Sequence, residues 1–231
     1  MPTCSNRMKS RKVEVREPVE NYYIFCEGEK TEPQYFKGMK SIIASDPMYT
    51  NMIYIEGLGR NTLSVLQYAE NYITEHKITT GVVWCVYDKD DFPADRFNAV
   101  EQRMKSLNQK LSEDDVALRY YAAWSNQCIE YWFRLHFEFY QTDGSRDDHI
   151  RKLNEYFEKK QCGKYEKNRD DIFEILTWNG QPKQAIKWAN RRLDQCSGKT
   201  PTDSVPATKV HKLVQGLAKY FPERYKHQYT L

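Results

Sequence analysis

The first 140 residues alternate between short β-type segments and longer helical segments, and this alternation limits the fold more than any other feature. Each of four β-type segments is followed by a helical one, an order that indicates parallel strands joined by helices. The predicted strands are residues 21–27, 51–56, 81–88 and 117–124. The predicted helices are residues 31–45, 61–77, 95–111 and 126–138. We therefore predict an α/β fold with a mostly parallel four-stranded sheet flanked by helices.

The remaining residues show helical patterns and no further strand pattern. These helical patterns cover residues 147–160, 168–178, 181–196 and 205–221. Glycine and prolines between residues 196 and 206 indicate an exposed loop there. We predict two domains, a core over residues 1–140 and a helical, basic extension over residues 141–231 that packs on the core.

Charge is distributed unevenly between these two parts. The formal net charge is only +3, but acidic residues are in slight excess over residues 1–140 and basic residues over residues 141–231. This division suits an enzyme that gathers cations at one site and holds a polyanion with the other part. Ordinary charge variation between two halves of a globular protein is the alternative.

Composition and motifs exclude several classes of protein. A chain that is 40% hydrophobic and 29% charged is neither a disordered tail nor a collagen nor a coiled coil. The longest apolar run, residues 82–87, is far shorter than the roughly 20 residues that span a bilayer. The basic N-terminus, residues 7–12, is followed by no apolar signal segment, so we expect a cytoplasmic protein. The six cysteines form no C-x-x-C pair, which favours reduced thiols.

Acidic residues fall at the ends of the predicted strands. Glu27 ends the first strand, Asp88 and Asp90 end the third, and Glu130 follows the fourth. The carboxyl ends of parallel strands meet at one edge of a sheet, where ligands bind. Carboxylates that converge there repel one another unless a cation lies between them, and their hard oxygen atoms favour Mg²⁺ or Mn²⁺. Gly28 allows the backbone or a phosphate to approach Glu27 closely.

Each acidic residue also has a simpler interpretation. The Asp88-x-Asp90 pair is consistent with a solvated turn, and Glu130 is correctly spaced to pair with Arg134 on one helix face. Glu32, like its neighbour Glu29, is the kind of residue that helix N-termini favour. The metal-site interpretation depends on the combination, not on any one of these residues.

Neither the 28–31 segment nor the 57–59 segment completes a nucleotide-binding glycine motif, which argues against ATP and NAD chemistry.

Four segments resemble the motifs of RloB-like proteins. They are residues 25–36, 86–92, 125–137 and 206–210. The resemblance spans nearly the whole chain, and its first motif is the most specific. RloB-like proteins are similar to Toprim domains, the metal-dependent catalytic fold of topoisomerases, primases and OLD-type nucleases. The resemblance thus implies that residues 1–140 are a Toprim-like catalytic core.

The resemblance also implies roles for individual residues. Glu27 matches the Toprim glutamate, Asp88 and Asp90 match the Toprim D-x-D pair, and Glu130 matches a further metal-site acid of OLD-type enzymes. The second glutamate of the OLD-type motif lies closer to the first than Glu32 does to Glu27. The roles of Glu29 and Glu32 therefore stay open. Position 127 is glutamine where the motif has proline.

These correspondences lead to a functional hypothesis, a Mg²⁺- or Mn²⁺-dependent nuclease that cuts RNA, tRNA among the candidates, or DNA. Asp88 and Asp90 hold the principal metal ion, and Glu130 or Glu32 completes a second site. Glu27 is either a ligand or the base that activates water. The resemblance further implies an effector of anti-phage defence by abortive infection, with a partner ATPase of the ABC/AAA type. A homodimer is compatible with this hypothesis.

Basic residues supply the expected contacts with nucleic acid. Lys30 and Lys89 flank the acidic residues and are candidates to neutralise the scissile phosphate, or they are simply solvated. In the extension, lysines and arginines alternate with Tyr165, Trp178 and Trp188, a pattern typical of nucleic-acid binding. Helices with solvated lysines and core tryptophans give the same pattern. The candidates there are Lys183, Lys187, Arg191 and Arg192.

Two other functions compete with the nuclease. One keeps the Toprim chemistry but forms a covalent intermediate through a tyrosine, as topoisomerases do, and none of the 17 tyrosines stands out for that role. The other is a non-catalytic adaptor that binds the ATPase.

His136, two turns beyond Glu130, is expected to pack on the helix rather than to act as an acid.

Overall fold

The computed structural model describes residues 19–59 and 62–231, and its centre is one mixed sheet. The strands are β1 (Tyr22–Cys26), β2 (Ile53–Gly57), β3 (Gly81–Asp88), β4 (Leu118–Asn126) and β5 (Ala207–Thr208). Their order is β2-β1-β3-β4-β5, with the first four parallel and β5 antiparallel to β4. The predicted α/β fold is confirmed, but the sheet has five strands, not four. A two-residue strand is too short to show any periodicity, so the helical pattern predicted from residue 205 included it.

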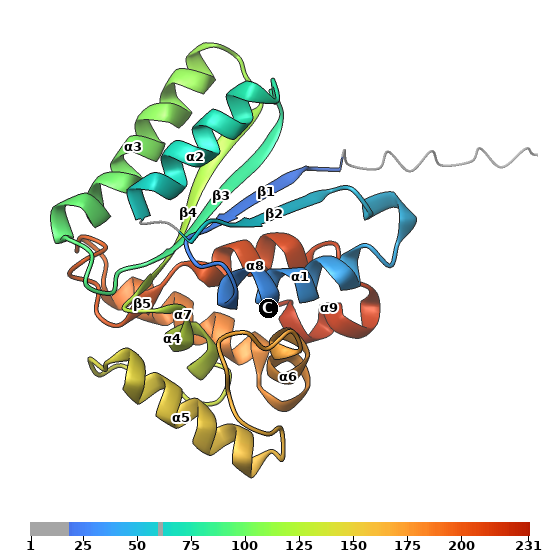
Figure 1. The fold of residues 1–231 in the computed structure, drawn as a ribbon, viewed down its shortest axis with the longest axis vertical. Helices are drawn as coiled ribbons and strands as arrows, with labels where there is room; N and C mark the ends of the chain where they lie inside the picture. The colour runs from blue at the N-terminus through green and yellow to red at the C-terminus, as the bar shows by residue number, and fades with distance from the viewer. Residues whose placement is uncertain (1–18, 60–61) are drawn as a thin grey trace, which may run out of the picture.

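One face of the sheet is covered by two helices, α2 (Thr62–Glu75) and α3 (Ala94–Glu113). Figure 1 shows them side by side along β3 and β4. Side chains alternate across a strand, so Val83 and Cys85 of β3 point to this face. Both are buried there against helix residues such as Phe97, which explains the nearly continuous apolar sequence of β3.

The opposite face packs against α1 (Thr31–Ile43) and α8 (Val210–Ala218). Trp84 and Val86 of β3 point to this side. Pro33 lies in the first turn of α1, where its missing N–H costs no helical hydrogen bond. The sheet is therefore sandwiched between helices, as the β-α alternation predicts.

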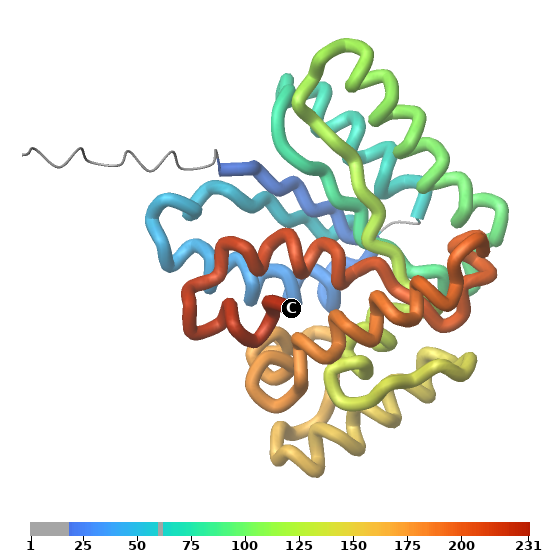
Figure 2. Tube along the Cα trace, turned by 180° about the vertical axis from the view of Figure 1, so that it is seen from behind, coloured from blue at the N-terminus to red at the C-terminus, as the bar shows by residue number. Residues whose placement is uncertain are grey.

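The remaining helices pack beneath α1 and α8. They are α4 (Ile129–Arg134), α5 (Arg146–Lys159), α6 (Ile172–Asn179), α7 (Pro182–Gln195) and α9 (Glu223–Tyr229), and a 3₁₀ turn spans Pro47–Tyr49. Seen from behind in Figure 2, the C-terminal helices run across the molecule below the sheet. The helical character of residues 141–231 is confirmed apart from β5.

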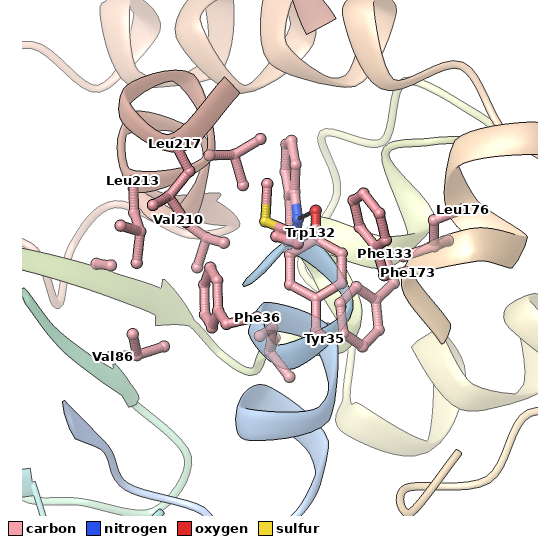
Figure 3. Packing of buried hydrophobic residues seen from close by; sticks show 14 of the residues in the cluster. Tyr35, Phe36, Val86, Trp132, Phe133, Phe173, Leu176, Val210, Leu213 and Leu217 are labelled. Carbon is pink, nitrogen blue, oxygen red and sulfur yellow. Dashed lines mark hydrogen bonds between the residues drawn. The ribbon is translucent and has the colours of Figure 1, made fainter. Parts of the chain in front are cut away.

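Aromatic packing connects the predicted core and the predicted extension. Figure 3 shows Tyr35 of α1 beside Trp132 and Phe133, with Phe173 of α6 on the same side. The indole N–H of Trp132 donates a hydrogen bond of 3.1 Å to the hydroxyl of Tyr35. One cluster of buried residues runs across residue 140 through these rings. The division into two domains at that residue stays a prediction.

The segment after β4 differs from the predicted helix over residues 126–138. Ser125 and Asn126 belong to β4, and α4 begins at Ile129 after the N-cap residue Cys128. Ser125 hydrogen-bonds with the Thr208 hydroxyl, and the Asn126 amide donates to two backbone carbonyls in the 201–202 loop. The predicted helix therefore begins three residues later than expected, because strand β5 and this loop hold Ser125 and Asn126 in the extended strand.

Two further expectations concern membranes and thiols. No helix within residues 19–59 and 62–231 has both the length and the apolar character needed to cross a bilayer. The described cysteines are all free, and Cys26, Cys85 and Cys128 are buried as small apolar side chains. The basic segment at residues 7–12, like Cys4, lies outside the described residues.

Candidate functional site

The predicted acidic residues converge on one cavity of about 480 Å³ at the carboxyl edge of β1 and β3. We call these five residues the acidic cluster: Glu27, Glu32, Asp88, Asp90 and Glu130. They come from the ends of two adjacent strands, the first turn of α1 and the first turn of α4. Strand order brings Glu27, Asp88 and Asp90 to this edge, and Glu32 and Glu130 join them from the starts of two helices.

Glu27 directly follows β1 and is held by two donors. Its Oε2 accepts hydrogen bonds of 3.1 Å from the Thr62 hydroxyl and 3.1 Å from the backbone N–H of Asp88. Burial raises the pKa of Glu27 above its ordinary value, although these two hydrogen bonds lower it in part. A carboxyl group whose pKa is raised in this way is suited to accept a proton from water.

Glu32 lies in the first turn of α1 and is 5% exposed. A Cβ atom built on Gly28 would lie 2.3 Å from Glu32 Oε2, so the close approach that Gly28 allows is to this carboxylate. Burial first, and the nearby carboxylates of Glu130 and Glu27 after it, raise the pKa of Glu32 to about 7. Glu32 does lie at the start of a helix, as its simpler interpretation has it, but its burial beside other carboxylates is not explained by the helix dipole.

Asp88 ends β3 and is almost fully buried. Its Oδ2 accepts a hydrogen bond of 3.1 Å from the backbone N–H of Ile129, at the start of α4. Its Oδ1 is buried and has no hydrogen-bond partner in the described part of the chain. Burial, reinforced by Glu32 and Glu130, raises the pKa of Asp88 well above its ordinary value.

Asp90 lies two residues further on, in the left-handed region at φ +34°. It is more exposed than Asp88, and burial raises its pKa above the ordinary value, although the nearby Arg146 lowers it in part. Lys89 points its ammonium group to the backbone carbonyl of Asp90, at 3.1 Å, rather than standing apart in solvent.

Glu130 lies in the first turn of α4 and is 1% exposed. The Tyr165 hydroxyl donates a hydrogen bond of 3.0 Å to its Oε1, while Oε2 has no hydrogen-bond partner within the described ranges. Arg134, the partner that helical spacing suggested, forms an ion pair with Glu138 instead. The Glu130–Arg134 interpretation is therefore wrong.

One residue that the sequence reasoning missed lies at the centre of the site. Arg146, at the first position of α5, places Nη2 at 2.6 Å from Asp90 Oδ2 and 3.1 Å from Asp88 Oδ2. Its Nε lies 3.7 Å from Glu130 Oε2. A signal was present, since a basic residue in the first turn of a helix opposes the helix dipole and needs another reason to be there.

Two lysines complete the cavity wall. Lys30 precedes α1, and Lys167 belongs to the loop between α5 and α6. The Thr31 hydroxyl donates a hydrogen bond of 2.8 Å to the backbone carbonyl of Lys167, which fixes this loop against the start of α1. The cavity thus has acidic residues at its base and exposed ammonium groups on its wall.

The four basic residues predicted in the extension are not part of this cavity. Lys183 and Lys187 line a separate hollow at the start of α7. Arg191 lies over the ring of Phe139, at 4.8 Å. Arg192 donates hydrogen bonds to the backbone carbonyls of Val205 and Pro206, so it holds the 196–206 loop in place.

The predicted aromatic residues and His136 differ in how far they are buried. Trp178 is 51% exposed, so its interpretation as a core residue is wrong, whereas Trp188 is partly buried and stacks on Phe139. Tyr165 is buried against Glu130. His136 is fully buried and hydrogen-bonds through Nδ1 to the carbonyl of Trp132, which agrees with the packing role expected of it.

The acidic cluster matches a hard divalent cation in the chemistry of its donors. All five side chains offer carboxylate oxygens, and two buried oxygens, Asp88 Oδ1 and Glu130 Oε2, are left without hydrogen bonds by the residues described. As the side chains lie, however, no three His, Cys, Asp or Glu residues of the described chain are gathered closely enough to hold a metal ion. The guanidinium of Arg146 lies among them instead.

Comparison with known proteins gives one result. The model of the RloB-like protein family matches residues 22–217, which confirms the resemblance carried by the four motifs. Comparisons with curated proteins and with solved structures give no significant match. A match over most of the sequence shows that the chain belongs to the RloB-like protein family.

Proposed function

We propose that this protein is a Mg²⁺- or Mn²⁺-dependent nuclease with a Toprim-like active site. The observation that carries the proposal is the convergence of five carboxylates on one cavity, with two buried carboxylate oxygens that receive no hydrogen bond from the described residues. Burying like charges together is costly unless a cation compensates them. Such an arrangement is typical of a functional site.

Each member of the acidic cluster has a role in this proposal. Asp88, Asp90 and Glu130 would hold the metal ion, and Glu32 would complete a second site. A bound metal ion supplies charge neutralisation at the phosphate and lowers the pKa of water. Glu27, fixed by Thr62 and the Asp88 backbone, receives the proton of the attacking water.

The lysines on the cavity wall suit a phosphodiester substrate. Lys30 and Lys167 are exposed and face the same cavity as the acidic cluster. Ammonium groups next to a carboxylate-bound cation attract and orient a phosphate group. RNA, with tRNA as a candidate, and DNA both offer this chemistry.

The setting is part of the same proposal. The RloB-like resemblance supports a cytoplasmic effector of anti-phage defence that acts with an ABC/AAA-type ATPase. An adaptor that only binds this ATPase is the alternative, and one observation favours it: Arg146 already forms ion pairs with three of the acidic residues.

The decisive experiment is a cleavage assay with total tRNA, single-stranded DNA and plasmid DNA in Mg²⁺, Mn²⁺ or EDTA. The double variant Asp88→Asn/Asp90→Asn removes the central ligands, and Asp91→Asn, an exposed neighbour, is the matched control. We expect metal-dependent cleavage by the wild type and by Asp91→Asn and none by the double variant. Cleavage that persists in the double variant, or no cleavage even with the partner ATPase present, contradicts the proposal.

A further inference from the structure

We propose that Arg146 is a built-in occupant of the acidic cluster that a divalent cation must displace in order to bind. This inference rests on the proposed function, because it concerns how the same site is loaded. It assigns to one residue of α5 the control of metal entry.

The contacts of Arg146 place it where a cation is needed. Its guanidinium reaches Asp90 at 2.6 Å, Asp88 at 3.1 Å and Glu130 at 3.7 Å. These three carboxylates come from a strand end, the turn after it and a helix, so the guanidinium joins three separate segments. A single positive charge thus compensates three acidic groups, two of which are almost fully buried.

The local structure of α5 does not account for an arginine at this position. Ser145 caps the helix through a capping box. Its hydroxyl accepts a hydrogen bond from the backbone N–H of Asp148, and the Asp148 carboxylate accepts one from the backbone N–H of Ser145. Arg146 takes no part in this cap, and its charge opposes the positive end of the helix dipole. Its position is therefore explained by the acidic cluster, and its side chain is free to leave without unwinding the helix.

The fit of the guanidinium is incomplete. Asp88 Oδ1 and Glu130 Oε2 are buried without a hydrogen bond from any described residue, and Arg146 Nε, 3.7 Å from Glu130 Oε2, is buried and likewise makes no hydrogen bond within the described chain. A divalent cation brings twice the charge and accepts oxygen ligands from several directions. Because the guanidinium already occupies the space between the carboxylates, the cation and Arg146 compete for the same acidic groups.

The side chain of Arg146 is 32% exposed, so it has a path away from the carboxylates. It shares the wall of the cavity with Lys30 and Lys167. Once displaced, the guanidinium is a third positive group beside the bound phosphate, with the fork-like geometry that suits phosphate oxygens. Metal entry and substrate binding therefore favour each other.

The test measures Mn²⁺ binding to the full chain without nucleic acid, by calorimetry and by the electron paramagnetic resonance signal of free Mn²⁺. The variant Arg146→Gln removes the competing charge. The control is Arg151→Gln on the same helix, an exposed arginine that pairs only with Asp148 and Glu155 of α5 among the described residues. We expect Arg146→Gln to bind Mn²⁺ roughly tenfold more tightly or better, because a charge-assisted contact no longer has to be broken. The Arg151→Gln variant should bind Mn²⁺ as the wild type does.

A second measurement covers the case in which Arg146→Gln is poorly folded without metal. Its thermal unfolding temperature in EDTA should lie below that of the wild type, because the buried acids lose their compensating charge, and Mn²⁺ should raise it more than it raises that of the wild type. Equal or weaker Mn²⁺ binding by Arg146→Gln, with binding by the wild type intact, overturns the role of Arg146 and leaves the metal site standing. No Mn²⁺ binding by either protein overturns the metal site and this inference together.

Discussion

The hydroxyl of Tyr165 donates a hydrogen bond of 3.0 Å to Glu130 Oε1, and both side chains are buried. Tyr165 comes from the loop between α5 and α6, and Glu130 from the first turn of α4. An acidic residue that follows the parallel sheet is thus oriented by a side chain from the C-terminal half. The C-terminal half of the chain therefore takes part in building the site as well as in covering the sheet.

This contact predicts the effect of Tyr165→Phe. Removing the hydroxyl leaves a second oxygen of a buried carboxylate without a donor, which costs about 1–3 kcal/mol. We expect the free energy of unfolding in urea to fall by that amount without Mn²⁺. The control Tyr121→Phe, at an exposed position, should unfold as the wild type does. Unchanged stability of Tyr165→Phe means that Glu130 does not depend on this hydrogen bond.

The contact between Gly28 and Glu32 predicts a coupled pair of substitutions. In Gly28→Ala, the new methyl group falls 2.3 Å from the present position of Glu32 Oε2, so this buried carboxylate has to move. Because Glu32 borders the proposed metal site, we expect Mn²⁺ affinity to fall about tenfold, as is typical when a supporting group is displaced.

A double-mutant cycle identifies the cause of that loss. In a Glu32→Ala background there is no carboxylate to displace, so Gly28→Ala should then change Mn²⁺ affinity very little. Calorimetric titration of the four proteins gives the coupling energy directly. Equal losses in both backgrounds would show that the alanine acts on the backbone and not through Glu32.

The structure divides the basic residues predicted to bind nucleic acid into two kinds. Arg192 holds the carbonyls of Val205 and Pro206, so Arg192→Ala should lower the free energy of unfolding by about 1–2 kcal/mol. Lys183 and Lys187 line an open hollow, so their replacement by alanine should leave stability unchanged and reduce the salt dependence of nucleic-acid binding. Urea unfolding and filter binding at several salt concentrations measure the two effects. Loss of stability in the lysine variants contradicts this division.

The sequence predicted the sheet well because its signals are local. Strand β3 has the predicted bounds, Gly81–Asp88, since a long apolar run between a glycine and an acidic pair leaves little choice. Strand β5 was missed because its two residues, Ala207 and Thr208, are defined only by pairing with distant Asn126 and Ser125. The same pairing extends β4 beyond its predicted end at residue 124.

The site was predicted as far as strand order determines it. Glu27, Asp88 and Asp90 follow from the rule that ligands gather at the carboxyl edge of a parallel sheet. Arg146 does not follow from any such rule, because its partners lie 56 and 58 residues away along the chain. For the same reason the sequence did not predict the burial of Glu32 and Tyr165, which depends on the segments that pack around them.

The last prediction concerns acid stability and begins with His136, which is fully buried. Its Nδ1 hydrogen-bonds to the Trp132 carbonyl, and its Nε2 has no partner among the residues that the structure describes. Protonation places a charge and an unsatisfied N–H in the core, so burial lowers the pKa of His136 from 6.5 to about 4. Between these two values the unfolded chain binds the proton and the folded chain does not. The contribution of His136 to stability is therefore fully present above pH 6.5 and is lost as the pH drops toward 4.

The variant His136→Gln removes this titration while its amide N–H is still able to donate to the Trp132 carbonyl. We expect the wild type to lose about 3 kcal/mol more than His136→Gln between pH 7 and pH 4, the equivalent of the pKa difference. Urea unfolding at a series of pH values measures both losses. His227→Gln, at an exposed position on α9, is the control and should lose as much stability as the wild type. If His136→Gln loses as much stability as the wild type over this range, the acid sensitivity arises from other groups.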